Sequence, residues 1–293
     1  MLTKQANGPG GRSHIFDDWL RSTTHGSSSD YVLQHCEEWA QGLLDLADRL
    51  PPDYGWRVTT PRSLKQELRK AQSSADSMNA VYWTDVFRSV EAYGVLSVWR
   101  GTELLRAAVP LLNDHQVLAP AVISRALLEL SVSFLMTAND IVDIASKAMK
   151  TPSGGLAAST ELEEIVLSAI YGSRRPGTPK HLKAQSIIKY IDFLTQAPGA
   201  SELKPVYEYL CDIAHPNTLG NARFAAVVIK KHGDGSETLR LERRAEAGHS
   251  HEIRTKTLWA VGWAAYTIRS GFQMNQSATK SVLSRWSTRT KHN

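Results

Sequence analysis

Apolar side chains recur every three to four positions along most of this chain, which is the spacing of one face of an α-helix. The first such segment follows Asp30, a good helix-capping residue, and ends at Pro51 and Pro52. The pattern then predicts a charged surface helix over residues 63–77 and a long core helix over residues 78–112. The first third of the chain therefore favours an all-α protein.

The most apolar stretch, residues 117–138, contains only two charged side chains, Arg125 and Glu129. A helix that is apolar on all sides is either a membrane span or the centre of a helical bundle. Two charges near its middle, together with Pro120, favour the bundle. We predict a helix over residues 116–150, kinked or restarted near the proline. Because a short connection joins it to the preceding core helix, the two should pack antiparallel.

Beyond this pair, shorter helices are predicted over residues 161–171, 183–196 and 201–215, and a long last helix over residues 251–274. The helix at 183–196 should turn one face inward, formed by Ile187, Ile188, Ile191 and Leu194. Three aromatic residues of the first core helix are interpreted as packing anchors: Trp83, Phe87 and Trp99.

The one clear strand signal is FAAVVIK followed by ETLRLER, separated by HGDGS with the Gly and Asp of a hairpin turn. The prediction is thus an all-α, multi-helix bundle with long antiparallel core helices and one inserted β-hairpin at about 224–243. We expect a mobile N-terminal arm over residues 1–28, a single helical domain over 29–276 and a basic tail over 277–293.

The composition is typical of a soluble globular protein, with 42% hydrophobic and 22% charged residues in 293 positions. The formal charge of +5 is unevenly distributed. Residues 280–293 carry four Lys or Arg residues and no acid, and a second basic cluster surrounds a Pro/Gly turn at Arg174, Arg175, Lys180 and Lys183. Such clusters either attract phosphates or form solvated surface.

The chemical motifs that identify common enzyme classes are missing. The sequence has no glycine-rich phosphate loop, no Gly-x-Ser-x-Gly and no His-Glu-x-x-His, and it lacks the two Glu-x-x-His pairs of a di-iron bundle. Cys36 and Cys211 match no metal spacing and are too few for a disulfide framework. We therefore expect no metal and no cofactor. Without an apolar signal segment at the N-terminus, we expect a cytoplasmic protein with no membrane partner.

Arg125 and Glu129 stand four residues apart, so they share a helix face and can pair. A buried guanidinium needs more partners than one carboxylate supplies, because it has five N–H donors. Two interpretations stay open. The pair is either a structural device that fixes the helix register, or part of a pocket in which Arg125 holds an anion or a carbonyl group.

The stretch YEYLCDIAHPNTLG places Tyr207, Asp212 and His215 near the end of one helix, and Asn217 in the turn that follows. The helix dipole favours the charged form of a histidine at this position. His215 either caps the helix and closes the bundle, or serves as a general base or phosphate-contacting group with Arg125 as the anion holder.

SRALLELSVSFL and, far downstream, YEYLCDIAHPN together resemble a group of uncharacterised bacterial helical proteins. That group has an Arg-x-x-x-Glu core helix before a Tyr-x-x-Leu-x-x-x-x-His-Pro segment, and the match would cover residues 80–270. The chain is also distantly similar to HEPN-type domains, many of which are dimeric RNA-cleaving toxins or phage-defence effectors. In those domains an Arg lies about five residues before the His. Residues 208–212 contain no Arg, so Arg125 would have to replace it.

The residues and the resemblance together lead to two functional hypotheses, beside a purely structural protein in which each of these charges is a satisfied core group. The first is a helical binding or regulatory module, linked to phage defence or toxin–antitoxin biology, with a pocket formed by Arg125, Glu129, Tyr207 and His215. The second is a metal-independent ribonuclease that uses His215 and Arg125 at a dimer cleft. Either protein is expected to be a homo-oligomer, with RNA or another phosphate-bearing ligand as its partner and the basic clusters supplying affinity.

Overall fold

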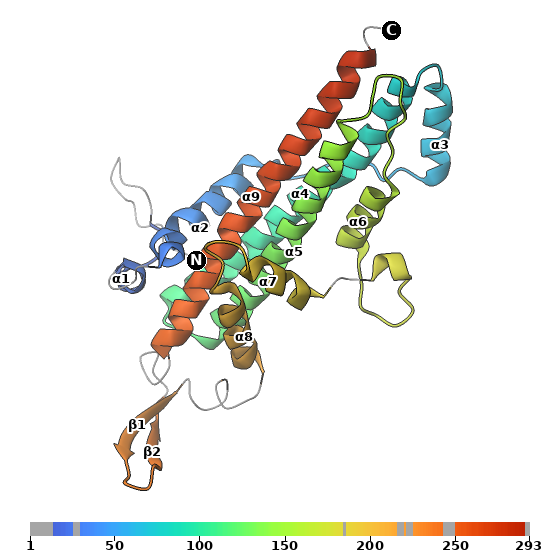
Figure 1. The fold of residues 1–293 in the computed structure, drawn as a ribbon. Helices are drawn as coiled ribbons and strands as arrows, with labels where there is room; N and C mark the ends of the chain where they lie inside the picture. The colour runs from blue at the N-terminus through green and yellow to red at the C-terminus, as the bar shows by residue number, and fades with distance from the viewer. Residues whose placement is uncertain are drawn as a thin grey trace, which may run out of the picture. The chain divides into compact units, whose positions relative to one another are not determined.

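The computed structural model describes residues 14–25, 30–183, 186–215, 220, 225–242 and 250–290. Within them lie nine α-helices, one short 3-10 helix and one two-stranded antiparallel sheet (Figure 1). This confirms the predicted all-α bundle with an inserted β-hairpin. The helices and strands are α1 (Asp18–His25), α2 (Tyr31–Arg49), α3 (Pro61–Lys70), α4 (Ala75–Asn113), α5 (Leu118–Ala148), α6 (Thr160–Tyr171), η1 (Lys180–Leu182), α7 (Ile187–Thr195), α8 (Leu203–Ala214), β1 (Ala226–Lys231), β2 (Glu237–Leu241) and α9 (Ser250–Thr290).

The chain divides into two compact units, and each of the longest helices contributes to both. The first unit consists of Met1–Gly42, Leu104–Leu127 and Pro205–Trp263, and the second of Leu43–Glu103, Leu128–Lys204 and Ala264–Asn293. The domain boundaries predicted from the sequence stay a prediction.

Several contacts within the first unit involve α2. Asp30 caps this helix as expected, because its carboxylate accepts the backbone N–H groups of Val32 and Leu33. The buried thiol of Cys36 donates to the carbonyl of Leu258 in α9. A Cβ atom at Gly262 would lie 3.1 Å from Cα of Cys36, so glycine permits this close approach of the two helices.

The segment before α2 is docked on the same unit. The backbone N–H groups of Ile15 and Phe16 donate to the Glu37 carboxylate, and Asn113 exchanges hydrogen bonds with the backbone of Ile15 and Asp17. Phe16 is buried. Residues 14–17 are therefore fixed by side chains of both α2 and α4.

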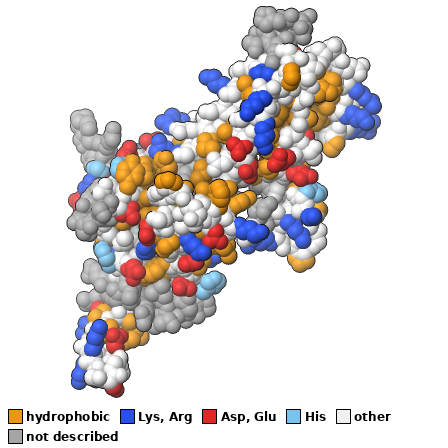
Figure 2. Space-filling model, in the orientation of Figure 1, with side chains coloured by type: hydrophobic (Ala, Val, Ile, Leu, Met, Phe, Trp, Pro, Cys, Tyr) orange, Lys and Arg blue, Asp and Glu red, His pale blue; other side chains and the backbone are white. Residues whose placement is uncertain are grey.

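The β-hairpin carries one apolar face. Its strands pair in the register Ala226↔Leu241 and Val228↔Leu239, with an irregularity after Val228. Paired residues of an antiparallel sheet point to the same side. Val228, Leu239 and Leu241 nevertheless stay exposed, and Figure 2 shows hydrophobic side chains on the hairpin surface.

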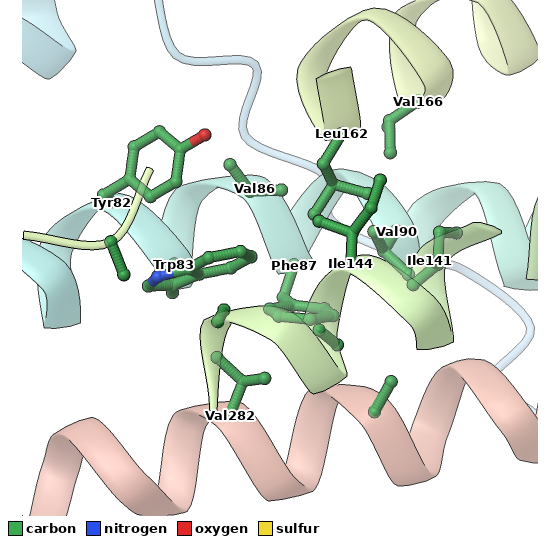
Figure 3. Close-up of a cluster of buried hydrophobic side chains, with 14 of the residues drawn as sticks. Tyr82, Trp83, Val86, Phe87, Val90, Ile141, Ile144, Leu162, Val166 and Val282 are labelled. Carbon is green, nitrogen blue, oxygen red and sulfur yellow. The ribbon is translucent and has the colours of Figure 1, made fainter. Parts of the chain in front are cut away.

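The core of the second unit is an aromatic and aliphatic cluster to which four helices contribute (Figure 3). Trp83 and Phe87 of α4 are fully buried in it, which confirms their interpretation as packing anchors. The cluster also contains Tyr82, Val86 and Val90 from α4, Ile141 and Ile144 from α5, Leu162 and Val166 from α6, and Val282 and Trp286 from α9.

Two polar side chains of α4 fix the connection that leads into α6. The Asn79 amide donates to the carbonyl of Gly155 and accepts from the N–H of Ala157, both at 2.8 Å. The Tyr82 hydroxyl bonds both the carbonyl and the N–H of Ser159. Ser159 in turn caps α6 by accepting from the N–H of Leu162. These bonds set the position at which α6 begins.

The structure corrects two details of the sequence prediction. Ile188 is 55% exposed rather than inward-facing, because the buried face of α7 consists of Ile191 and Leu194 alone. The last helix does not end near residue 274 but continues to Thr290. Apolar residues at Ala278, Val282 and Trp286 extend its buried face by four-residue steps.

Both prolines near the α4–α5 connection lie inside helices. Pro120 is the third residue of α5, where the missing N–H has no partner within the helix in any case. Pro110 lies in α4, which ends three residues later at Asn113. By length and composition, α5 alone among the described helices could cross a membrane, and 44% of its most apolar window is buried inside the protein.

Candidate functional site

The structure brings Arg125 of α5 and Tyr207 of α8 together within the first unit. The guanidinium carbon of Arg125 lies 5.8 Å from the centroid of the Tyr207 ring, within the range of a cation–π contact. Tyr207 is buried, and Arg125 is half-buried. Glu129, one turn farther along α5, is also half-buried and belongs to the second unit.

His215 and Asp212 lie at the exposed end of α8. His215 follows the last helical residue, and its backbone N–H donates to the carbonyl of Cys211. Both side chains are exposed. His215 stands eight positions after Tyr207 in the sequence, which corresponds to about 12 Å along a helix axis. Asn217, also predicted as a site residue, lies outside the described residues.

The connection between α6 and α7 forms a second candidate site in the second unit. We call residues 172–183 the basic loop. Its two ends meet where the N–H of Ser173 donates to the carbonyl of Leu182, next to a bridge between Ser173 and Lys183. Inside the loop, the N–H and hydroxyl of Thr178 both donate to the carbonyl of Arg175. Gly177 has φ +83°, a conformation that favours glycine.

The basic loop presents only positive charge. It contains no acidic residue, and five of its side chains are exposed: Arg174, Arg175, Lys180, His181 and Lys183. Hydrogen bonds between Ser173 and Leu182 and between Thr178 and Arg175 constrain the loop backbone that carries these cations. The two arginines are the residues that the sequence predicted to bind a phosphate-bearing ligand.

A cavity of about 550 Å³ lies between α6 and the basic loop, which are in contact. Its lining combines acidic and basic side chains: Glu161, Glu164, Ile165, Ser168, Lys180, His181 and Lys183. No ion pair joins these acids to these bases within the part of the chain that the structure describes. Figure 2 shows red and blue side chains next to each other over this region.

A second groove, of about 460 Å³, lies between α5 and α9 in the same unit and is chemically different. Serine, methionine and small apolar side chains line it, among them Ser146, Met149, Met274 and Ser277, and no charged residue does. Charged groups thus converge at the cavity beside the basic loop. Among the described residues, no group of three or more His, Cys, Asp or Glu side chains is placed to hold a metal ion.

Asp140 of α5 lies close enough to Glu161, one of the two acids that line the cavity, for their charges to interact. Burial raises the pKa of Asp140 above its ordinary value, and the negative charges of Asp143 and Glu161 raise it further. Burial, followed by the charge of Asp140, also raises the pKa of Tyr190. Asp140, Asp143 and Glu161 therefore form a group of interacting negative charges that includes one lining residue of the cavity.

Sequence reasoning identified the arginines and lysines of the loop but missed the other wall. Glu161, Glu164 and Ser168 stand three and four residues apart, so they share one face of α6. From this spacing, a polar and acidic face of α6 could have been predicted. The missing information was that the loop folds back against this face.

No family model matches the chain, and no curated protein or solved structure matches it. The resemblance to HEPN-type domains and to helical proteins with the Arg-x-x-x-Glu and His-Pro segments stays a prediction.

Proposed function

We propose that this protein is a helical RNA-binding module that holds the phosphate backbone of a single RNA strand on the basic loop. The observation that carries this proposal is an ordered, acid-free loop with five exposed cationic or ionisable basic side chains in twelve residues. A strand with a phosphate at every nucleotide engages several such cations at once, and each engaged charge releases counterions.

The order of the loop strengthens the proposal. Flexible cations lose side-chain and backbone freedom when they bind, which reduces affinity. Here Ser173, Arg175 and Thr178 already fix the backbone through hydrogen bonds, and Gly177 supplies the turn. The backbone part of the ordering cost is therefore met by folding rather than by binding.

The geometry supports binding without cleavage. In the alternative, a metal-independent HEPN-like ribonuclease, Arg125 and His215 would act on one phosphate. Arg125 lies against Tyr207, whereas the backbone of His215 stands eight positions later, beyond the end of α8, which corresponds to about 12 Å along a helix axis. General acid–base catalysis needs groups within hydrogen-bond reach of the same atoms.

A regulatory role, as a homo-oligomer in phage defence or toxin–antitoxin biology, is part of the proposal.

The proposal is tested by fluorescence anisotropy with a labelled single-stranded RNA of about 12 nucleotides, within the usual footprint of single-strand binders. The loop variant replaces four cations by glutamine: Arg174→Gln, Arg175→Gln, Lys180→Gln and Lys183→Gln. We expect its Kd for RNA to rise at least tenfold, because four phosphate contacts are lost.

The matched control removes the same charge from four exposed residues of α3: Arg62→Gln, Lys65→Gln, Arg69→Gln and Lys70→Gln. We expect this control to bind RNA nearly as well as the wild type. Equal weakening in both variants would show a general charge effect and would overturn the assignment to the basic loop.

The same samples decide between binding and cleavage. Recovered RNA is analysed on a denaturing gel after incubation with EDTA. We expect intact RNA with the wild-type protein. Metal-independent cleavage that disappears in a folded His215→Ala variant would establish the ribonuclease instead.

A further inference from the structure

We propose that the cavity between α6 and the basic loop is a nucleotide subsite that takes one unstacked guanosine of the bound RNA strand. This inference rests on the proposed RNA-binding function and deepens it, because it assigns a base preference to the site. It follows from the arrangement of charge around the cavity.

The two walls of the cavity carry opposite charge. Glu161 and Glu164 project from one face of α6, and Lys180 and Lys183 belong to the facing loop. All four side chains are exposed, and among the described residues none of them forms an ion pair with another. The separated charges suit a ligand that presents hydrogen-bond donors on one side and an anion on the other.

A nucleotide of single-stranded RNA has this combination. Its phosphate would lie against Lys180 and Lys183, and its base would enter the cavity toward α6. The volume of about 550 Å³ is within the range of pockets that enclose small molecules. Proteins that read single-stranded RNA commonly bind bases splayed out in this way, through the Watson–Crick edge.

The acidic wall selects among the four bases. Guanine presents two adjacent donors on its Watson–Crick edge, N1–H and the N2 amino group, which one carboxylate can accept together. Cytosine and adenine each present one amino group beside a ring-nitrogen acceptor. Uracil presents a single N–H between two carbonyl oxygens, which a carboxylate repels. Glu161 and Glu164 therefore favour guanine most and uracil least.

The base preference is measured with uridine 11-mers that carry one central guanosine, adenosine, cytidine or uridine. We expect the wild-type protein to bind the guanosine-containing strand about tenfold more tightly than the all-uridine strand, since a good bidentate base contact contributes about that discrimination. The ratio of these two Kd values is the readout, because any change in the attraction of the RNA phosphate backbone to the protein affects both strands equally and cancels.

The test variant is Glu161→Gln with Glu164→Gln, which removes the acidic wall and retains the loop cations. Its matched control is Glu38→Gln with Glu103→Gln, two exposed acids outside the cavity. We expect the test variant to lose the guanosine preference while it still binds the all-uridine strand, and the control to keep the preference.

The outcomes separate the inference from the proposed function. If the wild type binds all four strands equally, or if the preference survives in the test variant, the guanosine subsite is wrong and RNA binding stands. If no strand binds, both are wrong. A guanosine preference that disappears in the test variant alone supports the subsite.

Discussion

Asp140 lies half-buried on α5, and two further acids, Asp143 and Glu161, act on its carboxyl group. Burial disfavours the charged form most, and the like charges add to that effect. The carboxylate is therefore less stable in the folded protein than in the unfolded chain. Its presence at neutral pH reduces stability and increases the negative potential beside the proposed subsite.

The Asp140→Asn variant should be more stable than the wild type near neutral pH. The folded-state pKa is raised above its ordinary value of 3.8, so stability falls as the pH rises from that value through the folded-state pKa. At a pH below both pKa values, the carboxyl is protonated in the folded and the unfolded protein, and the stability gained by Asp140→Asn should disappear.

Thermal unfolding of both proteins at about pH 7 and at successively lower pH toward about 4 measures this difference in stability. Asp53→Asn, at an exposed position, is the control. A gain that does not shrink with falling pH would contradict the assignment.

At the scale of single elements, α6 and the basic loop depend on neighbours that are distant in sequence. Asn79 and Tyr82 of α4 hold the connection before α6, and the contact between Ser173 and Lys183 closes the loop after it. The acidic wall and the basic wall of the cavity are thus positioned by separate sets of hydrogen bonds.

The β-hairpin should contribute little to the stability of the helices. All of β2 is exposed, and β1 is exposed after Val227. Replacing residues 227–241 by a short Gly-Ser linker should therefore change the Tm by no more than about 2 °C, since isolated two-stranded hairpins are marginally stable. Circular dichroism during heating measures this. A much larger decrease in Tm would show that the hairpin packs on the helices.

Local signals in the sequence were sufficient for most elements. HGDGS between two strand-like runs predicted the hairpin, a periodic apolar face predicted α4, and a nearly unbroken apolar stretch predicted α5. The extension of α9 was missed because polar and basic residues surround the apolar positions at Val282 and Trp286. Helix ends in general depend on tertiary packing, which local propensity does not contain.

The candidate site was foreseen only in part. The loop cations could be predicted from the sequence, since they are clustered in it. The cavity could not, because it forms only when the loop closes at Ser173 and Lys183 and places η1 against α6. The proximity of Arg125 to Tyr207 likewise depends on how α5 and α8 pack within the first unit.

At the scale of the whole molecule, the excess positive charge is concentrated in two segments. The basic loop holds four Lys or Arg residues without an acid, and residues 280–293 hold another four. Subtracting those eight from 34 leaves 26 basic residues against 29 acidic ones. Non-specific attraction of RNA to the remainder of the chain should therefore be weak, and the salt dependence of binding should report on these segments.

The most direct test of RNA binding by the basic loop is the slope of log K against log salt concentration for the wild type and the loop variant. For single strands the slope is about −0.7 for each phosphate contact, so removing four contacts should reduce its magnitude by up to about 2.8. The α3 control should keep the wild-type slope. If the loop variant instead has the same slope as the wild type, the loop does not contact the phosphates.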